Sequence, residues 1–311
     1  MKRKSTIIAY MLAGALVLSC TTNTQKSDKK SEREEIIGKS SPHIENGIMT
    51  PEVLYSFGRI GEVQVSPDKS HIVYEVTYVS IPQNKMNTEL FVMKTDGSEK
   101  KQLTRSNSRE SNPRWIYGGK KIAFLSDKDG TAQLWTMAID GSDEEKISDI
   151  EGGIGGFSFS PDEKKVLFVK NVKTQPTAAD RYPDLPEASG RIIDDLMYKH
   201  WDQWVMEVPH PFVADFSEGK LQDAKDILEG EPYESPMLPF GGMEQLAWSP
   251  DSKTIAYTCR KKTGKEYALS TNSDIYLYRV ESGETLNITE GMPGYDTNPQ
   301  FSPDGKYIAW Q

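Results

Sequence analysis

The stretch Val65-Ser66-Pro67-Asp68-Lys69 predicts the fold, because variants of it recur along the chain. In each copy an apolar or aromatic residue precedes Ser-Pro-Asp, and an apolar strand follows. Further copies begin at Phe159, Trp248 and Phe301, and a degenerate copy begins at Trp115, so the steps are 50, 44, 89 and 53 residues. Proline fixes φ at the first turn position, and aspartate or glycine suits the next. A period of about 40–50 residues is typical of β-propeller blades.

Each unit holds enough strand-like segments for a blade of four strands. After the strand that leads into the turn come three more, at 122–125, 133–137 and 145–148 in one unit and at 255–258, 274–278 and 285–289 in another. Their apolar character suits sheets that pack between neighbouring sheets. A β-sandwich is the main alternative, but it gives no reason for a fixed turn sequence at a fixed period. We therefore predict an all-β propeller, incomplete at about four to five blades, over residues 49–311.

The step of 89 residues indicates an insertion within one blade. No blade pattern is present from about residue 171 to 209, and the third strand of that blade resumes at His210. Apolar residues at helical spacing predict a helix over Arg191–Tyr198, so we expect a mostly helical insertion. Long insertions in a compact fold are commonly functional.

The N-terminus has the features of a targeting segment. Lys2, Arg3 and Lys4 precede an apolar run over residues 7–18 that is too short to span a bilayer. The run ends next to Cys20, which resembles a bacterial lipoprotein signal. Residues 1–19 are then a signal peptide, Cys20 is lipidated, and residues 20–48 form a flexible tether. We expect an anchor in the bacterial cell envelope, at the outer membrane or in the periplasm; an ordinary secretory signal and a single membrane anchor are the alternatives.

Composition excludes several classes of protein. The 311 residues are 36% apolar and 27% charged, which is a globular balance and not that of a disordered, collagen-like or multispanning membrane chain. The net charge of −9 argues against nucleic acid as a partner. No His, Cys, Asp and Glu set has the spacing of metal ligands, so we expect no metal and no cofactor. Cys259 ends a predicted strand, where we expect a buried, inert thiol.

Several stretches together resemble the prolyl oligopeptidase family of serine peptidases, in particular its dipeptidyl-peptidase and acylaminoacyl-peptidase members. These stretches are an entry helix at 49–54 with Thr50 as N-cap and Pro51 as first residue, an aromatic insertion at 196–204, and segments at 267–276 and 291–299. The resemblance covers residues 49–311. The insertion and the 267–276 segment are more specific than the Ser-Pro-Asp repeat, which Tol-system propellers share.

The resemblance implies a propeller followed by an α/β-hydrolase domain that carries a Ser-Asp-His triad. The serine of that triad lies in a G-x-S-x-G turn between a strand and a helix. This sequence contains no G-x-S-x-G, so we assign no catalytic residue to it and expect the hydrolase domain to be absent from this chain. In such enzymes the propeller admits oligopeptides and helps to hold the amino terminus of the substrate.

The insertion contains the candidate substrate-binding residues. Asp202 lies between Trp201 and Trp204. A carboxylate can bind the ammonium group of a peptide, and aromatic rings beside it suit a cation. In the alternative interpretation the two tryptophans pack the insertion onto a blade, and Asp202 caps a local turn.

Three functions remain open at this point. The first is a part of an exported serine exopeptidase that releases dipeptides or acylated residues from oligopeptides, with the missing hydrolase domain as partner. The second is a non-catalytic Tol-like propeller lipoprotein that acts as an envelope scaffold or binding module. The third, a sugar- or lactone-processing propeller, needs pore acids or metal ligands that this sequence does not display. The insertion favours the peptidase, because a scaffold has no need of it.

Overall fold

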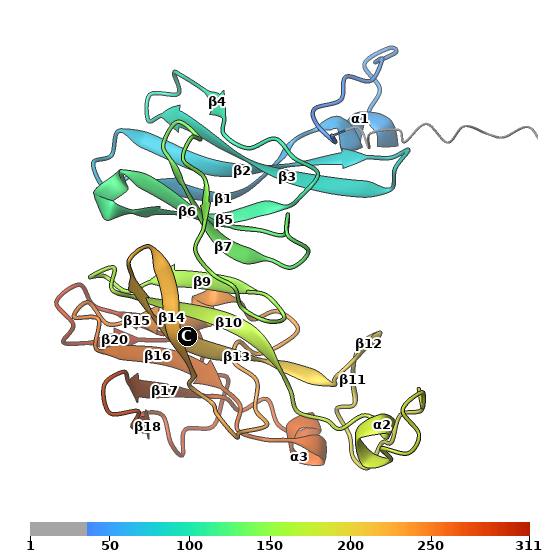
Figure 1. Cartoon of the computed structure of the whole chain (residues 1–311), viewed down its shortest axis with the longest axis vertical. Coiled ribbons are helices and arrows are strands. Elements are labelled where there is room, and N and C mark those ends of the chain that lie inside the picture. The colour runs from blue at the N-terminus through green and yellow to red at the C-terminus, as the bar shows by residue number, and fades with distance from the viewer. Residues whose placement is uncertain (1–35) are drawn as a thin grey trace, which may run out of the picture. The chain divides into compact units, whose positions relative to one another are not determined.

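The computed structural model describes residues 36–311, so the predicted signal peptide and Cys20 lie outside the described residues. Four antiparallel sheets of four strands follow one another along the chain, and a two-stranded hairpin comes after them (Figure 1). Each sheet is a propeller blade, and the hairpin begins a fifth. The predicted incomplete propeller of four-stranded blades is thus confirmed. Within residues 36–311, no helix combines the length and the apolar character needed to cross a membrane.

In the first, second and fourth blades the strands pair in chain order. The first blade contains β1 (Arg59–Val65), β2 (His71–Ser80), β3 (Lys85–Lys94) and β4 (Lys101–Gln102). The second contains β5 (Glu110–Ile116), β6 (Lys121–Ser126), β7 (Gln133–Ala138) and β8 (Glu145–Lys146), and the fourth contains β15 (Leu246–Trp248), β16 (Thr254–Cys259), β17 (Asp274–Arg279) and β18 (Thr285–Asn287). The final hairpin pairs β19 (Gln300–Phe301) with β20 (Ile308–Ala309).

The third blade carries the insertion. It contains β9 (Gly156–Phe159), β10 (Lys165–Lys173), β13 (Glu207–Ser217) and β14 (Lys220–Asp226). Strands β10 and β13 pair without interruption from Lys165 opposite Asp215 to Lys173 opposite Glu207. Both strands therefore extend into the stretch predicted as insertion. Residues 174–206, and not 171–209, separate them.

The prediction of a mostly helical insertion is wrong. Arg191–Tyr198 forms no helix, and the regular elements are the four-residue helix α2 (Ala178–Arg181) and a hairpin of β11 (Lys199–His200) and β12 (Gln203–Trp204). The Asp195 side chain competes for a backbone N–H that a helix would use, and the neighbouring Asp194 is held by an ion pair outside the segment. The Leu196 N–H donates to Asp195 Oδ1 at 2.7 Å, and Asp194 pairs with Arg181 at 2.8 Å.

The Ser-Pro-Asp repeat has a local structural reason. In the third blade, Ser160 Oγ donates to Asp162 Oδ1 at 2.7 Å and accepts from Lys165 N at 3.0 Å. The same pair of bonds recurs in the turns that begin at Ser249 and Ser302. Every bond spans at most five residues, so the turn forms wherever the sequence occurs.

Replacing Ser160 by alanine is expected to lower the free energy of unfolding by about 1–3 kcal/mol, because it removes both hydrogen bonds of a buried hydroxyl. Ser160 is 1% exposed, whereas Ser302 lies in the same turn at a more exposed position. Denaturant unfolding of S160A and S302A measures the difference, with a loss below about 1 kcal/mol expected for S302A. Equal losses in both variants would contradict the role of burial.

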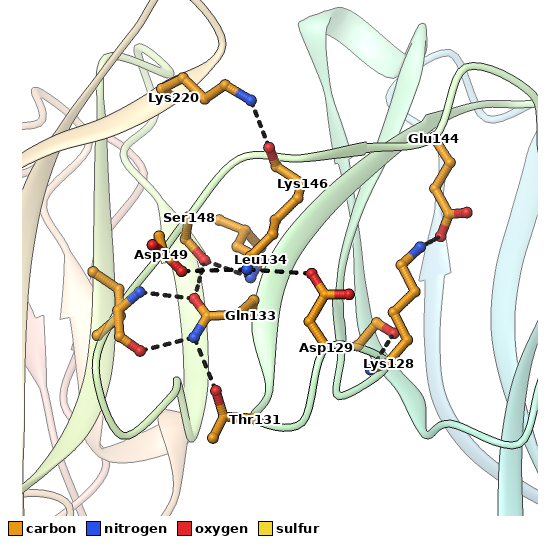
Figure 2. A network of polar contacts seen from close by, with 12 residues as sticks. Lys128, Asp129, Thr131, Gln133, Leu134, Glu144, Lys146, Ser148, Asp149 and Lys220 are labelled. Carbon is orange, nitrogen blue, oxygen red and sulfur yellow. Dashed lines mark hydrogen bonds and ion pairs between the residues drawn. The ribbon is translucent and has the colours of Figure 1, made fainter.

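A second polar repeat was not recognised in the sequence. In three blades, a side-chain oxygen of the third strand accepts from a hydroxyl two residues after the fourth strand, and that hydroxyl accepts a backbone N–H of the third strand. In the second blade, Ser148 Oγ donates to Gln133 Oε1 at 2.7 Å and accepts from Leu134 N at 2.8 Å (Figure 2). Glu89 with Thr104, and Asp274 with Thr289, repeat the arrangement. Sequence reasoning missed it because the partners are 14 to 15 residues apart and differ in type.

The core lies between successive blades. Apolar clusters join the first blade to the second around Phe124, the second to the third around Phe168, and the third to the fourth around Tyr257; these rings are fully buried. Lys220 adds a polar link from β14 to β8, because it donates to Lys146 O at 2.6 Å (Figure 2). Cys259 is buried, as predicted, and burial raises the pKa of its thiol, which disfavours the reactive thiolate.

The chain enters the first blade through α1 (Pro51–Ser56). Val53 N donates to Thr50 Oγ1 at 3.4 Å, so Thr50 is the predicted N-cap. On β1 the side chains of Ile60, Val63 and Val65 are exposed by 70%, 49% and 53%. An apolar face of the first blade thus lacks a neighbouring sheet among the described residues, as expected for an open ring.

Candidate functional site

The predicted substrate-binding residues lie on the hairpin of β11 and β12. Trp201 and Asp202 form its tip, and Trp201 has a φ of 51°, a conformation that bulky residues rarely adopt. Trp201 is 76% exposed and contacts only the exposed ring of Phe240 edge-on, at 5.6 Å between centroids, among the ring contacts of the described residues. Asp202 is exposed and makes no hydrogen bond or ion pair with any described residue. Neither side chain fills a core position.

Trp204 occupies a different environment from Trp201. The guanidinium of Arg191 lies 4.2 Å from the centroid of its ring, and the ammonium of Lys199 lies 4.5 Å from it. Two cations of the chain therefore already use this ring, which leaves Trp201 as the more available aromatic beside Asp202.

A buried carboxylate lies against the base of this hairpin. Glu234 belongs to the connection between the third and fourth blades, and its side chain is 4% exposed. The Tyr267 hydroxyl, from α3 (Gly264–Leu269), donates a hydrogen bond to Glu234 Oε1, and His200 Nε2 lies 3.8 Å from Oε2. Burial raises the pKa of Glu234 to about 7, against the opposing effects of the Tyr267 hydrogen bond and the Arg260 charge. This carboxyl group therefore changes its charge near neutral pH.

Arg260 places a positive charge near Glu234 and His200. Its guanidinium lies 4.5 Å from the centroid of the Tyr267 ring and 5.9 Å from that of Tyr295. Burial, and then the charge of Arg260, lowers the pKa of His200. The charged form of His200 is thus disfavoured beside Arg260.

Two cavities adjoin these groups. The smaller, of about 70 Å³, is lined by Glu234, His200, Tyr267 and Lys262 among others. The larger, of about 280 Å³, lies within the insertion and has mostly apolar walls. Gln175, Leu196, Met197 and Val205 line both cavities, so the two spaces are neighbours.

The insertion approaches the fourth blade closely at Gly264. A Cβ atom on this glycine would lie 1.9 Å from Asp195 Oδ2, and its φ of +53° also favours glycine. A side chain at this position would displace the Asp195 carboxylate, so Gly264 permits the close approach of the insertion to α3.

Sequence reasoning found the hairpin but missed Glu234, Tyr267 and Arg260. Tyr267 opens a segment that carried the family resemblance, whereas Glu234 lies in a blade connection with no distinguishing pattern. A buried acid between two blades has no local signal, because its side-chain partners Tyr267 and His200 are 33 and 34 positions away.

Known proteins share sequence similarity with most of this chain. The model of the TolB beta propeller domain matches residues 55–189. Dipeptidyl-peptidase 5 of Porphyromonas gingivalis is 54% identical over 262 residues, which are 84% of this chain and 38% of that protein. Over this stretch the chain is similar to dipeptidyl-peptidase 5. The dipeptidyl-peptidase 5 of Porphyromonas endodontalis is 48% identical over 86% of this chain and 38% of its own length.

A solved structure of Pyrococcus horikoshii acylaminoacyl peptidase matches 82% of this chain and 35% of its own, with a TM-score of 0.57 and 18% identity, which supports the fold. The predicted resemblance to dipeptidyl-peptidases is confirmed by the 54% identity to the Porphyromonas gingivalis protein. The chain spans about two fifths of the length of the dipeptidyl-peptidase 5 relatives. Their names do not favour the Tol-like scaffold.

Proposed function

We propose that this chain is the propeller part of a serine dipeptidyl-peptidase that removes dipeptides from the amino terminus of oligopeptides. The identity of 54% to a dipeptidyl-peptidase 5 carries the proposal. A hydrolase domain outside this sequence is the partner that supplies the serine nucleophile. The propeller and its insertion admit the peptide and orient it.

An exopeptidase needs a group that recognises the free amine of its substrate. The hairpin of β11 and β12 and the smaller cavity each offer a carboxylate for this purpose, Asp202 and Glu234. Asp202 has no partner among the described residues and lies beside the exposed ring of Trp201. A substrate ammonium entering here meets this carboxylate first and the buried Glu234 second. Charge-assisted hydrogen bonds to either acid hold the amine, and the wall formed by residues 174–206 stops longer chains.

Replacing Asp202 by alanine tests this proposal in the complete gene product that carries this chain. We expect kcat/KM for dipeptidyl substrates with a free amine to fall about tenfold or more, and no change for amine-blocked substrates. Asp184→Ala is the matched control, because Asp184 is an exposed acid of the same insertion. Unchanged kcat/KM for D202A would remove Asp202 from the site, and efficient cleavage of amine-blocked peptides would contradict a dipeptidyl-peptidase.

We propose further that the protein is exported and lipid-anchored in the bacterial cell envelope. The cationic N-terminus, the short apolar run and Cys20 support this. Cys20→Ser is expected to move the protein from the membrane fraction to the soluble fraction, as measured by fractionation and immunoblotting. Retention of C20S in the membrane fraction would indicate a different anchor.

A further inference from the structure

One oxygen of the Glu234 carboxylate is held by a tyrosine of the fourth blade. The Tyr267 hydroxyl donates a hydrogen bond to Glu234 Oε1, and this bond favours the charged form of the carboxyl group. His200 Nε2 lies 3.8 Å from Oε2, which is longer than a hydrogen bond. Oε2 is therefore the oxygen at which an ammonium group can bind without displacing the Tyr267 hydroxyl.

The guanidinium of Arg260 contacts two aromatic rings and lacks a carboxylate partner. It lies 4.5 Å from the centroid of the Tyr267 ring and 5.9 Å from that of Tyr295. Its Nη2 donates to Thr271 O at the long distance of 3.5 Å, and its buried Nε has no hydrogen-bond partner among the described residues. No acid in the described part of the chain forms an ion pair with it. Its charge is thus left to stabilise the Glu234 carboxylate, whose pKa it lowers.

Other ionisable groups line the same cavity or contact Glu234. They come from the insertion hairpin, the blade connection and the residues that end or follow β16, and they are His200, Tyr233, Lys262 and Cys259. Burial disfavours the charged forms of the His200 ring and the Cys259 thiol. Against the burial of Glu234 itself, the Tyr267 hydrogen bond and then the Arg260 charge are the largest effects that favour its carboxylate.

Binding of an ammonium group by Glu234 requires two opposite charges at the same pH. The carboxyl group must be deprotonated, whereas the substrate amine, with an ordinary pKa of about 8, must be protonated. Because the pKa of Glu234 is about 7, both charges coexist mainly between about pH 7 and pH 8. A further rise of about one unit in the pKa of Glu234 would close this interval.

We propose that Tyr267 and Arg260 are positioning residues of the amine site: Tyr267 fixes the Glu234 carboxylate through its hydroxyl, and Arg260 keeps that carboxylate charged. This inference rests on the proposed function, since it assumes that Glu234 binds the substrate amine. It adds that these two residues, and not Glu234 alone, set the pH range in which peptides bind.

Tyr267→Phe tests the inference, because it removes the hydroxyl and keeps the ring. With the complete gene product and a free-amine dipeptidyl substrate, the acid limb of kcat/KM is expected to move up by about one pH unit, since loss of the hydrogen bond raises the pKa of Glu234. Its kcat/KM then falls about fivefold at about pH 7 but only about twofold at about pH 8. Arg260→Gln is expected to move the limb in the same direction, and Arg260→Lys, which keeps the charge, to move it less.

Tyr182→Phe is the matched control, because Tyr182 is a tyrosine of the insertion that is 52% exposed. Its profile is expected to stay that of the parent. If Y267F does not fold, R260Q decides the question. An acid limb that stays in place in the folded variants, or an equal loss at every pH, would overturn the inference and leave the proposed function standing. Cleavage that does not require a free amine would instead overturn the proposed function.

Discussion

Glu234→Gln is expected to lower kcat/KM for free-amine dipeptidyl substrates by about 100-fold or more in the complete gene product. Glutamine keeps the size of the side chain and an oxygen that accepts from Tyr267, but it lacks the charge that attracts an ammonium group. The effect is expected to exceed that of Asp202→Ala, because Glu234 is buried and its charge is less screened by water. Steady-state kinetics on one substrate series measures both variants.

The dependence of kcat/KM on pH distinguishes binding of the substrate amine by Glu234 from a purely structural role of this residue. The pKa of Glu234 is about 7, and the carboxyl group must lose its proton to bind an ammonium. Turnover should therefore rise as the pH increases through about 7 and fall above about 8, where the substrate amine loses its proton. Glu234→Gln should abolish the rise of turnover through about pH 7, which is the acid limb of the profile. Glu229→Gln, an exposed acid of the same connection, should leave the profile unchanged. An acid limb that persists unaltered in E234Q would refute the assignment.

Glu110→Gln is expected to stabilise the protein at alkaline pH. Glu110 begins β5 and is 2% exposed, and it accepts hydrogen bonds from Ser106 and Ser126. Burial, with the nearby charge of Glu89, raises its pKa to about 8 from the ordinary value of 4.5. The folded protein therefore keeps a proton here that the unfolded chain releases above about pH 4.5. Its contribution to stability is complete below that pH and is lost as the pH rises through about 8.

The neutral amide of glutamine avoids this loss. Each pKa unit corresponds to about 1.4 kcal/mol, so E110Q should exceed the parent by about 2 kcal/mol or more at about pH 9 and by much less at about pH 5. Urea unfolding at both pH values measures the difference, and Glu151→Gln, at an exposed position, serves as control. A parent protein whose stability does not fall toward pH 9 would contradict a buried neutral Glu110.

Much of the propeller could be predicted from the sequence because its signals are local. The hydrogen bonds of the Ser-Pro-Asp turn join residues at most five positions apart. Each strand is likewise marked by a short run of apolar residues, or by apolar and polar residues in alternation. The insertion was predicted less well for the opposite reason. Residues 191–198 have apolar residues at helical spacing, but Asp194 pairs with Arg181 and Asp195 bonds a backbone N–H of the segment. In addition, Asp195 contacts Gly264, which follows a strand of the fourth blade.

The blades, their number in this stretch and the place of the insertion could be predicted from the sequence alone, whereas the exposure of Trp201 and Asp202 could not. The meeting of Glu234, Tyr267 and His200 depends on the folding of the whole chain, since these residues come from the blade connection, α3 and the insertion hairpin. The hydrogen bonds within a turn are specified by neighbours in the chain. The burial that raises the pKa of Glu234 to about 7 requires surfaces from separate segments to close around it, and no local pattern records that closure.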